Sequence, residues 1–145
     1  MVTKHVPHKF AKDTTTRTEI ADFMSPSVIS VCSHATIQET AQFMNEKNIG
    51  SVLIKENDEY IGIVTETDLS RKVLGGGLDP KTTAVNEVMT PQPLFTLDCH
   101  QPVTDANAFM AKNKVRHLPV TENDKIVGLI SVKDLVAFYA NPRLR

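Results

Sequence analysis

The eight residues Gly62–Leu69, GIVTETDL, return as Gly128–Leu135, GLISVKDL, at a shift of 66 residues. Without a gap, residues 48–69 align with residues 114–135, and apolar positions match apolar positions at nearly every step. A repeat of this length indicates two copies of one supersecondary unit, each too small to bury its own apolar face. We therefore expect a fold built from two copies, with binding sites that come in pairs where the copies meet.

The composition is that of an ordinary globular protein. The chain has 145 residues, of which 41% are hydrophobic and 23% charged, and its formal net charge is -1. The near-zero net charge shows no excess of positive charge that would favour nucleic-acid binding. Apolar runs such as residues 61–64 are too short to span a bilayer. Polar residues interrupt the first twenty positions, so no signal peptide is predicted. We expect a cytoplasmic protein with no nucleic-acid or membrane partner.

Cysteines and histidines show no pattern of a metal or redox site. Cys32 and Cys99 stand at unmatched positions of the two copies, and lone thiols in a reducing cytosol are expected to be reduced, small buried hydrophobes. Among the five histidines, only His5 and His8 have ligand-like spacing. We predict no metal site. No Ser-His-Asp order, Cys/His pair or carboxylate dyad stands out, so we also predict no enzyme.

Hydrophobic periodicity and turn signals predict the order strand, helix, strand, strand, helix in each copy, and so a mixed α/β (α+β) fold. In the first copy the elements are a strand over 28–31, a helix from the capping box Thr36-x-x-Glu39 to about Asn48, strands over 51–54 and 60–64, and a helix over 65–73. In the second copy they are a strand over 94–96, a helix with Pro102 in its first position, strands over 117–120 and 126–130, and a helix over 131–139.

These elements predict five segments along the chain. They are an N-terminal tail (1–18), a first repeat (19–75), a linker (76–84), a second repeat (85–140) and a short C-terminal tail (141–145). Met24 and Pro26, near the start of the first repeat, match Met89 and Pro91 at a shift of 65 residues.

The repeated motifs Thr65-x-x-Asp68 and Ser131-x-x-Asp134 have a purely structural interpretation. Each is typical of a helix start, with a hydroxyl at the N-cap and an acid at the third helical position. Gly62 and Gly128, which precede them, are then strand glycines that allow close packing of a helix.

The same motifs also have a functional interpretation. A helix start at the end of a strand offers free N–H groups and a partial positive charge to an anion, and the Ser/Thr hydroxyl can bond a phosphate. One turn along, an aspartate can accept hydrogen bonds from both hydroxyls of a ribose diol. Phosphate and diol together indicate a nucleotide, but the spacing alone leaves both interpretations open.

Taken together, several motifs resemble a tandem cystathionine-β-synthase (CBS) domain pair, also called a Bateman module. They are Phe23-Met24-Ser25-Pro26, Val88-Met89-Thr90-Pro91, Arg116-His117-Leu118-Pro119-Val120 and the two Gly-x-x-Ser/Thr-x-x-Asp motifs. The resemblance covers residues 20–140, and it implies two β-α-β-β-α repeats packed through their sheets about a pseudo-twofold axis. It also implies two clefts at that seam, where one repeat holds ribose and phosphate and the other encloses the adenine.

Carried over to this chain, the resemblance implies two sets of ligand-binding residues. One cleft would use Ser131, Asp134, Leu129 and Arg116, with Ile29, Ile49, Gly50 and Ser51 at the adenine. The other would use Thr65, Asp68 and Ile63, with Phe95, Val115, Arg116 and His117 across the seam.

We expect the two clefts to differ. Lys133 places a cation between Ser131 and Asp134, whereas Thr67 stands at the matching position beside the acidic Glu66. A phosphate is attracted by Lys133 and opposed by Glu66, so the cleft of Asp68 is predicted to be the weaker phosphate site. Arg116 faces a glycine of the other copy, so only one repeat supplies a guanidinium; the alternative role for Arg116 is a surface ion pair.

The leading hypothesis is a stand-alone regulatory protein that binds AMP, ADP, ATP, NAD or S-adenosylmethionine and uses no catalytic cofactor. Binding would change how the two repeats are arranged relative to each other, or the association of subunits or of a regulated partner. Amphipathic helices over residues 36–47 and 102–112 predict a homodimer. The alternative is a structural protein-interaction module with no physiological nucleotide, in which Asp68 and Asp134 serve only as helix caps.

Overall fold

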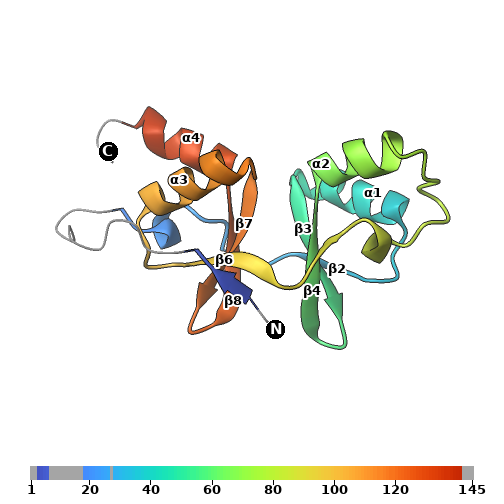
Figure 1. The fold of residues 1–145 in the computed structure, drawn as a ribbon, viewed down its shortest axis with the longest axis horizontal. Helices are drawn as coiled ribbons and strands as arrows, with labels where there is room; N and C mark the ends of the chain where they lie inside the picture. The colour runs from blue at the N-terminus through green and yellow to red at the C-terminus, as the bar shows by residue number, and fades with distance from the viewer. Residues whose placement is uncertain (1–2, 7–17, 27, 142–145) are drawn as a thin grey trace. The chain divides into compact units, whose positions relative to one another are not determined.

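The computed structural model describes residues 3–6, 18–26 and 28–141 (Figure 1). The described residues fall into two compact units. The first unit comprises Ile29–Leu94, and the second joins the described part of Thr3–Val28 to the chain from Phe95 onward. Each unit holds one four-stranded sheet and its helices, which confirms the mixed α/β class. None of the described helices is long and apolar enough to cross a bilayer.

The first unit follows the predicted order and adds short elements. Its strands are β2 (Ser30–Cys32), β3 (Ser51–Glu56), β4 (Glu59–Thr65) and β5 (Thr90–Pro91). Its helices are α1 (Ile37–Lys47), α2 (Glu66–Asp68), the π-helix η2 (Leu69–Leu74) and the 3-10 turn η3 (Val85–Glu87). The sheet order is β2-β3-β4-β5, with β2 parallel to β3 and the other pairs antiparallel. The parallel pair requires a crossover, which α1 supplies.

The second unit repeats this plan. Its strands are β1 (Thr3–His5), β6 (Leu94–Asp98), β7 (His117–Glu122) and β8 (Lys125–Ser131), in the order β1-β6-β7-β8. Its helices are the 3-10 turn η1 (Ile20–Asp22), α3 (Val103–Asn113) and α4 (Val132–Ala140), and α3 lies against α4 (Figure 1). The prediction for Pro102 is off by one residue, because Pro102 is the extended N-cap and α3 begins at Val103.

Local signals in the sequence fix several element boundaries. Thr36 and Glu39 form the predicted capping box at the start of α1. Asn48 ends α1 in the left-handed conformation, and Lys114 does the same for α3. The hairpins turn at Asn57-Asp58 and Asn123-Asp124, where all four residues have positive φ. Such turns match the twist of the paired strands, and Asn and Asp tolerate them well.

The segment that opens each repeat packs on the strands of the other repeat's unit. Ser25 exchanges backbone hydrogen bonds with Leu129 of β8, at 2.9 and 3.2 Å. Correspondingly, β5 pairs with β4 through Gly62 and Ile63. Residues 19–26 therefore belong to the second compact unit and residues 85–94 to the first. No feature of the linear repeat indicated this exchange.

The two strand glycines are explained by the exchange. A Cβ on Gly62 would lie 2.5 Å from Met89 Sδ and 2.8 Å from the Thr90 carbonyl oxygen. A Cβ on Gly128 would lie 2.9 Å from Met24 Sδ and closer still to the carbonyl oxygen of Ser25. The expectation that these glycines accommodate a helix was therefore wrong. They accommodate the Met-x-Pro segment that opens the other repeat.

Each unit has its own apolar core. In the second unit the core is formed by residues that include Ile20, Leu97, Phe109, Val120, Ile130 and Phe138. In the first unit it is formed by residues that include Ile37, Met44, Val52, Ile54, Val64 and Val88. The segment predicted as a linker, 76–84, also packs within the first unit, since the Pro80 and Thr83 carbonyls accept hydrogen bonds from the first turn of α1.

Candidate functional site

The helix start of the second repeat has a complete capping box. Asp134 Oδ2 accepts hydrogen bonds from the Ser131 backbone N–H at 2.8 Å and from the Ser131 hydroxyl at 3.1 Å. In return, the Ser131 hydroxyl oxygen accepts from the Asp134 N–H at 3.4 Å. Asp134 is half-buried, and among the described residues its second oxygen, Oδ1, has no hydrogen-bond or ion-pair partner. One carboxylate oxygen therefore caps the helix, and the other remains able to accept.

The helix start of the first repeat has the same capping box with one addition. Asp68 Oδ2 accepts from the Thr65 N–H at 2.9 Å and from its hydroxyl at 3.3 Å. Asp68 Oδ1, however, forms an ion pair with Lys72 Nζ at 2.9 Å. Lys72 Nζ also donates to the Val88 carbonyl at 2.9 Å. Both oxygens of Asp68, which is buried, are thus occupied within the first unit.

The helices that follow the two motifs also differ. After Ser131, α4 continues for nine residues as a regular α-helix. After Thr65, α2 spans only three residues, and the chain then widens into the six-residue π-helix η2. Only the second repeat therefore presents the start of a full α-helix, with its aligned peptide dipoles, behind the motif.

The predicted site residues of the second unit gather around the start of α4. Ser131 pairs with His117 across the hairpin, and the Arg116 carbonyl accepts a hydrogen bond from the Val132 N–H at 2.9 Å. Leu129 lies two residues before Ser131 on β8. The Arg116 side chain is exposed, and no described residue forms an ion pair with it, so the alternative role as a surface ion pair is not observed within the described part of the chain.

Two further predicted residues of the second unit are exposed apolar side chains. Phe95 is 41% exposed, although its ring lies 4.9 Å from that of Phe109 and under Lys4 Nζ at 5.1 Å. Val115, 37% exposed, follows Lys114, the C-cap of α3. Large apolar groups left in solvent are candidates for ligand contact.

The predicted site residues of the first unit form a matching group. Ser51 pairs with Thr65, and the Gly50 carbonyl accepts from the Glu66 N–H at 3.0 Å, as Arg116 does in the second unit. The remaining members lie on the neighbouring strands or at their ends. They are Ile29, whose carbonyl accepts from the Leu53 N–H, Ile49, which precedes β3, and Ile63, which is buried in β4. Each unit thus brings together its own share of the predicted residues.

Charged side chains differ at the two motifs as expected. Lys133 is exposed at the second position of α4, where it can attract an anion that approaches the helix start. In the first unit, Glu66 and Thr67 are exposed at the matching positions.

The two cysteines lie near the end of the first strand of each repeat, at positions that do not match: Cys32 is the last residue of β2, and Cys99 is in the turn after β6. Both are free thiols, as predicted; Cys99 is buried but Cys32 is exposed, so the expectation that both are buried was wrong for Cys32. Burial, and then the hydrogen bond to Glu122, raise the pKa of Cys99 to about 11. The Cys99 thiol is therefore protonated at neutral pH.

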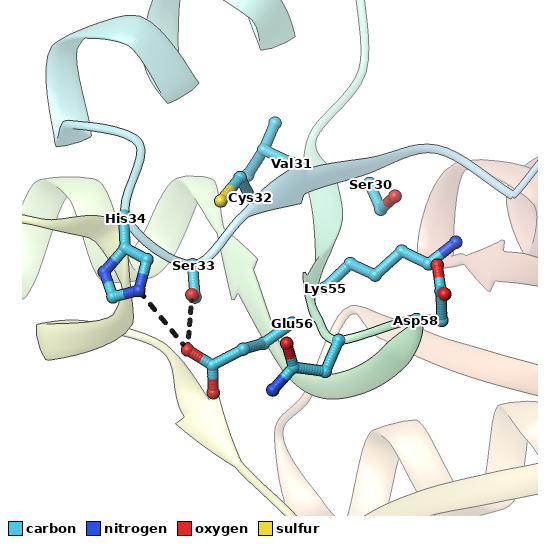
Figure 2. Close-up of a pocket in the computed structure, with 9 residues that line it drawn as sticks. Ser30, Val31, Cys32, Ser33, His34, Lys55, Glu56 and Asp58 are labelled. Carbon is cyan, nitrogen blue, oxygen red and sulfur yellow. Dashed lines mark hydrogen bonds and ion pairs between the residues drawn. The ribbon is translucent and has the colours of Figure 1, made fainter.

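Beside Cys32 the first unit has an open pocket of about 490 Å³ (Figure 2). In it, Glu56 Oε1 accepts from the Ser33 hydroxyl at 2.9 Å and lies 3.5 Å from His34 Nε2. The pocket is lined by Ser30, Val31, Cys32, Ser33, His34, Lys55, Glu56, Asn57 and Asp58. None of these residues belongs to the predicted ligand-binding set.

The equivalent turn of the second unit gathers three groups that can bind metal ions. One ligand atom each from Asp98, Cys99 and His100 lies within 4.8 Å of the other two. The three residues are consecutive in the sequence, unlike the separated pair His5 and His8, whose spacing is typical of metal ligands. His8 lies outside the described residues.

Comparison with known proteins identifies the repeat. The family model of the CBS domain matches twice, over residues 20–75 and 85–141. The chain belongs to the CBS-domain family. It is 30% identical to the CBS domain-containing protein YhcV of Bacillus subtilis over 116 residues, which cover 80% of this chain and 81% of YhcV. The resemblance drawn from the motifs is thereby confirmed.

Solved structures of CBS-domain proteins share the fold. A protein of Burkholderia ambifaria with CBS domains matches with a TM-score of 0.79 and 32% identity, over 86% of this chain and 96% of that one. The CBS domain pair of protein MJ0100, solved in complex with 5'-methylthioadenosine and S-adenosyl-L-methionine, matches with a TM-score of 0.74 and 22% identity. That match covers 86% of this chain and 97% of the other.

Proposed function

We propose that this protein is a regulatory module that binds an adenosyl ligand, and that the start of α4 holds the ribose and phosphate. The observation that carries the proposal is the carboxylate of Asp134, which caps the helix through Oδ2 and leaves Oδ1 without a described partner. The structural and functional interpretations of the motif are therefore compatible in this repeat. Asp134 does not have to give up its cap in order to accept a hydrogen bond from a ribose.

The chemistry around Asp134 suits the rest of such a ligand. The Ser131 hydroxyl and the positive end of the α4 dipole favour a phosphate or carboxylate, and Lys133 adds a full positive charge. Hydrogen bonds to a charged acceptor contribute about 1.5–3 kcal/mol each. The contacts to adenine expected from the family resemblance remain a prediction.

The ligand class is supported by the family and by the known ligands of one relative of the fold. MJ0100 was solved with two adenosyl compounds, and the motif residues of this chain can bind the ribose that such compounds share. The candidates are AMP, ADP, ATP, NAD and S-adenosylmethionine. A ligand alters conformation or association only through different affinities for the two states, so we propose that binding shifts such an equilibrium in a homodimer or in a complex with a regulated partner.

A thermal-shift panel of these five compounds tests the proposal. A ligand present at 100 times its dissociation constant should add about 2.7 kcal/mol of stability. For a chain of this length, that corresponds to a rise in melting temperature of roughly 5–10 °C. If no member of the panel raises the melting temperature, the alternative of an interaction module whose aspartates serve only as caps is favoured. Light scattering with and without the ligand then tests whether binding changes the association state.

A further inference from the structure

The turn between β6 and α3 collects donor atoms from three separate segments of the second unit. Asp98, Cys99 and His100 place a carboxylate oxygen, a thiol sulfur and an imidazole nitrogen within 4.8 Å of one another. Glu122 is at the end of β7, and its Oε2 atom is 3.5 Å from Cys99 Sγ. Glu19 is in the segment before η1, and its Oε2 atom is 3.0 Å from His100 Nδ1.

Backbone hydrogen bonds hold this turn in place from both sides. The Cys99 N–H donates to the Thr121 carbonyl at 2.8 Å, and the Cys99 carbonyl accepts from the Ala21 N–H at 2.9 Å. Within the turn, Asp98 Oδ1 accepts from the His100 N–H at 2.9 Å. Donor atoms carried by a fixed backbone lose little freedom when they close around an ion.

The charge of the cluster favours a cation. Three carboxylates, those of Asp98, Glu122 and Glu19, lie beside the thiol and the imidazole of this turn. No lysine or arginine is paired with these carboxylates in the described part of the chain. An incoming divalent ion would therefore meet uncompensated negative charge.

We propose that this turn binds a divalent transition-metal ion of the zinc type, with Cys99, His100 and Asp98 as ligands. Zinc accepts thiolate, imidazole and carboxylate donors in a tetrahedral arrangement, at about 2.0–2.3 Å from the ion. A thiolate with an imidazole selects zinc and its chemical neighbours over magnesium and calcium, which prefer oxygen. Coordination draws the three donor atoms closer together, and the thiol proton leaves to solvent as the Cys99–metal bond forms.

The carboxylates of Glu19 and Glu122 complete the site. Since Glu19 is bonded to Nδ1 of His100, the other ring nitrogen, Nε2, is left for the metal. A carboxylate behind a ligand histidine is the usual outer-sphere arrangement at protein zinc sites, where it fixes the ring and strengthens the ligand. Glu122 stands close enough to Cys99 to serve as the fourth ligand.

The first repeat offers a natural control for the proposal. At a shift of 66 residues, Cys32, Ser33, His34 and Glu56 stand where Asp98, Cys99, His100 and Glu122 stand in the second repeat. There a serine hydroxyl occupies the place of the Cys99 thiol, and it donates to Glu56 (Figure 2). The described residues of the first unit bring no three such donors within 4.8 Å of one another. The proposal therefore assigns the metal to the second repeat alone.

The test uses the full chain without a polyhistidine tag, stripped of metal by a chelator and then titrated with Zn²⁺ or Co²⁺. We expect one Zn²⁺ per chain by calorimetry, and with Co²⁺ a thiolate-to-cobalt charge-transfer band in the near ultraviolet. The Cys99→Ser variant should lose the band, and the Cys32→Ser variant should keep it. A band that survives Cys99→Ser, a band that disappears with Cys32→Ser, or the absence of stoichiometric binding would overturn the proposal.

Because Cys99 is buried, its replacement can disturb folding, so a second pair of variants uses exposed residues. The His100 side chain is 64% exposed and that of His34 is 76% exposed, so both can be replaced by Gln with little effect on the core. His100→Gln should weaken Zn²⁺ binding by at least the roughly 10–100-fold that loss of an outer-sphere partner costs. His34→Gln should leave the affinity unchanged. Equal effects of the two variants would also overturn the proposal.

Discussion

The two helix starts of this protein share a capping box but differ in what surrounds it. Asp134 and Asp68 both cap their helices through Oδ2, at nearly equal distances. In the first repeat, Lys72 Nζ forms an ion pair with the second oxygen of Asp68. In the second repeat, the residue at the position of Lys72 is Phe138. Phe138 is buried in the core of its unit, and its apolar ring cannot form an ion pair with the Asp134 carboxylate.

On the function proposed above, the duplicated motif keeps its structural role in both copies and is available to a ligand in only one. The cap is needed for each helix to start, so it is retained in both repeats. Under the proposed function, a ribose binds to a carboxylate oxygen that does not cap the helix; among the described residues, Asp134 Oδ1 has no partner, whereas Asp68 Oδ1 is paired with Lys72. We propose that the residue four positions after the aspartate, Lys72 or Phe138, determines whether that oxygen can accept a hydrogen bond from a ligand.

The largest effect on stability is expected from Phe138→Ala. The Phe138 ring packs edge-on against Phe23 at 5.5 Å and Tyr139 at 4.8 Å between centroids. Deletion of a buried phenyl ring costs about 3–5 kcal/mol. Urea denaturation measures the loss, with Val136→Ala, at a 62% exposed position of the same helix, as a control within about 0.5 kcal/mol of the parent. Equal losses in the two variants would show that Phe138 is not a core residue.

A smaller loss is expected from alanine at the two strand glycines. The added methyl group has no room in either repeat, and overpacking of this kind costs about 1–3 kcal/mol. Gly128→Ala should be the more damaging of the two, because its Cβ meets the backbone of Ser25 most closely. At Gly62 the nearest atom belongs to the flexible Met89 side chain, and the nearest backbone atom, the Thr90 carbonyl oxygen at 2.8 Å, is farther away than that of Ser25 is from Gly128. Urea denaturation that ranks Gly62→Ala as the more damaging would contradict the packing described here.

Replacement of Lys72 by Met should have a modest effect on stability and a clear effect on binding. The loss of a partly exposed ion pair and one hydrogen bond should cost about 1–2 kcal/mol. Because the change frees Asp68 Oδ1, calorimetry with the adenosyl ligand that binds the wild type should detect a second site. Arg71→Met, at the exposed neighbouring position, serves as the control and should add none. An unchanged number of sites in Lys72→Met would show that Lys72 does not block the first repeat.

The smallest effect is expected from modification of the exposed thiol. At pH 8 iodoacetamide should label Cys32 and leave the melting temperature unchanged, because the side chain lies outside the core. Cys99 should stay unlabelled until the protein is unfolded, because it is buried and its raised pKa keeps it protonated. Mass spectrometry of the digested protein distinguishes the two sites. Labelling of Cys99 in the native protein at a rate similar to that of Cys32 would contradict this comparison.

Local signals predicted most of the fold. The capping box at Thr36, the hairpin turns and the repeated apolar strands act over a few residues, so periodicity and turn chemistry were sufficient to place them. The exchange of the opening segments could not be predicted in this way. The fit of Met24 on Gly128 depends on contacts between residues about a hundred positions apart.

The candidate site was predictable only in its parts. The motifs identified Ser131 and Asp134, and the charge difference at Lys133 was visible in the sequence. The ion pair of Lys72 with Asp68 is a simple i,i+4 pair, and the alignment of Lys72 with Phe138 could have revealed it. The three consecutive donor residues Asp98–His100 were visible in the sequence, but their approach to Glu19 and Glu122 was not, because it depends on contacts between distant segments.

The most direct test of the account compares the ligand-dependent rise in melting temperature of Asp134→Ala and Asp68→Ala with that of the wild type. Both changes remove a capping carboxylate, which should lower the ligand-free stability by roughly 0.5–1 kcal/mol. Asp68→Ala also loses the ion pair with Lys72 and should be destabilised by about 1 kcal/mol more, so the rise is measured within each variant. With the best ligand of the adenosyl panel, Asp134→Ala should lose most of the wild-type rise of roughly 5–10 °C, and Asp68→Ala should keep most of it. If both variants keep the full rise, or if Asp68→Ala loses more than Asp134→Ala, the assignment of the ligand to the second repeat is wrong.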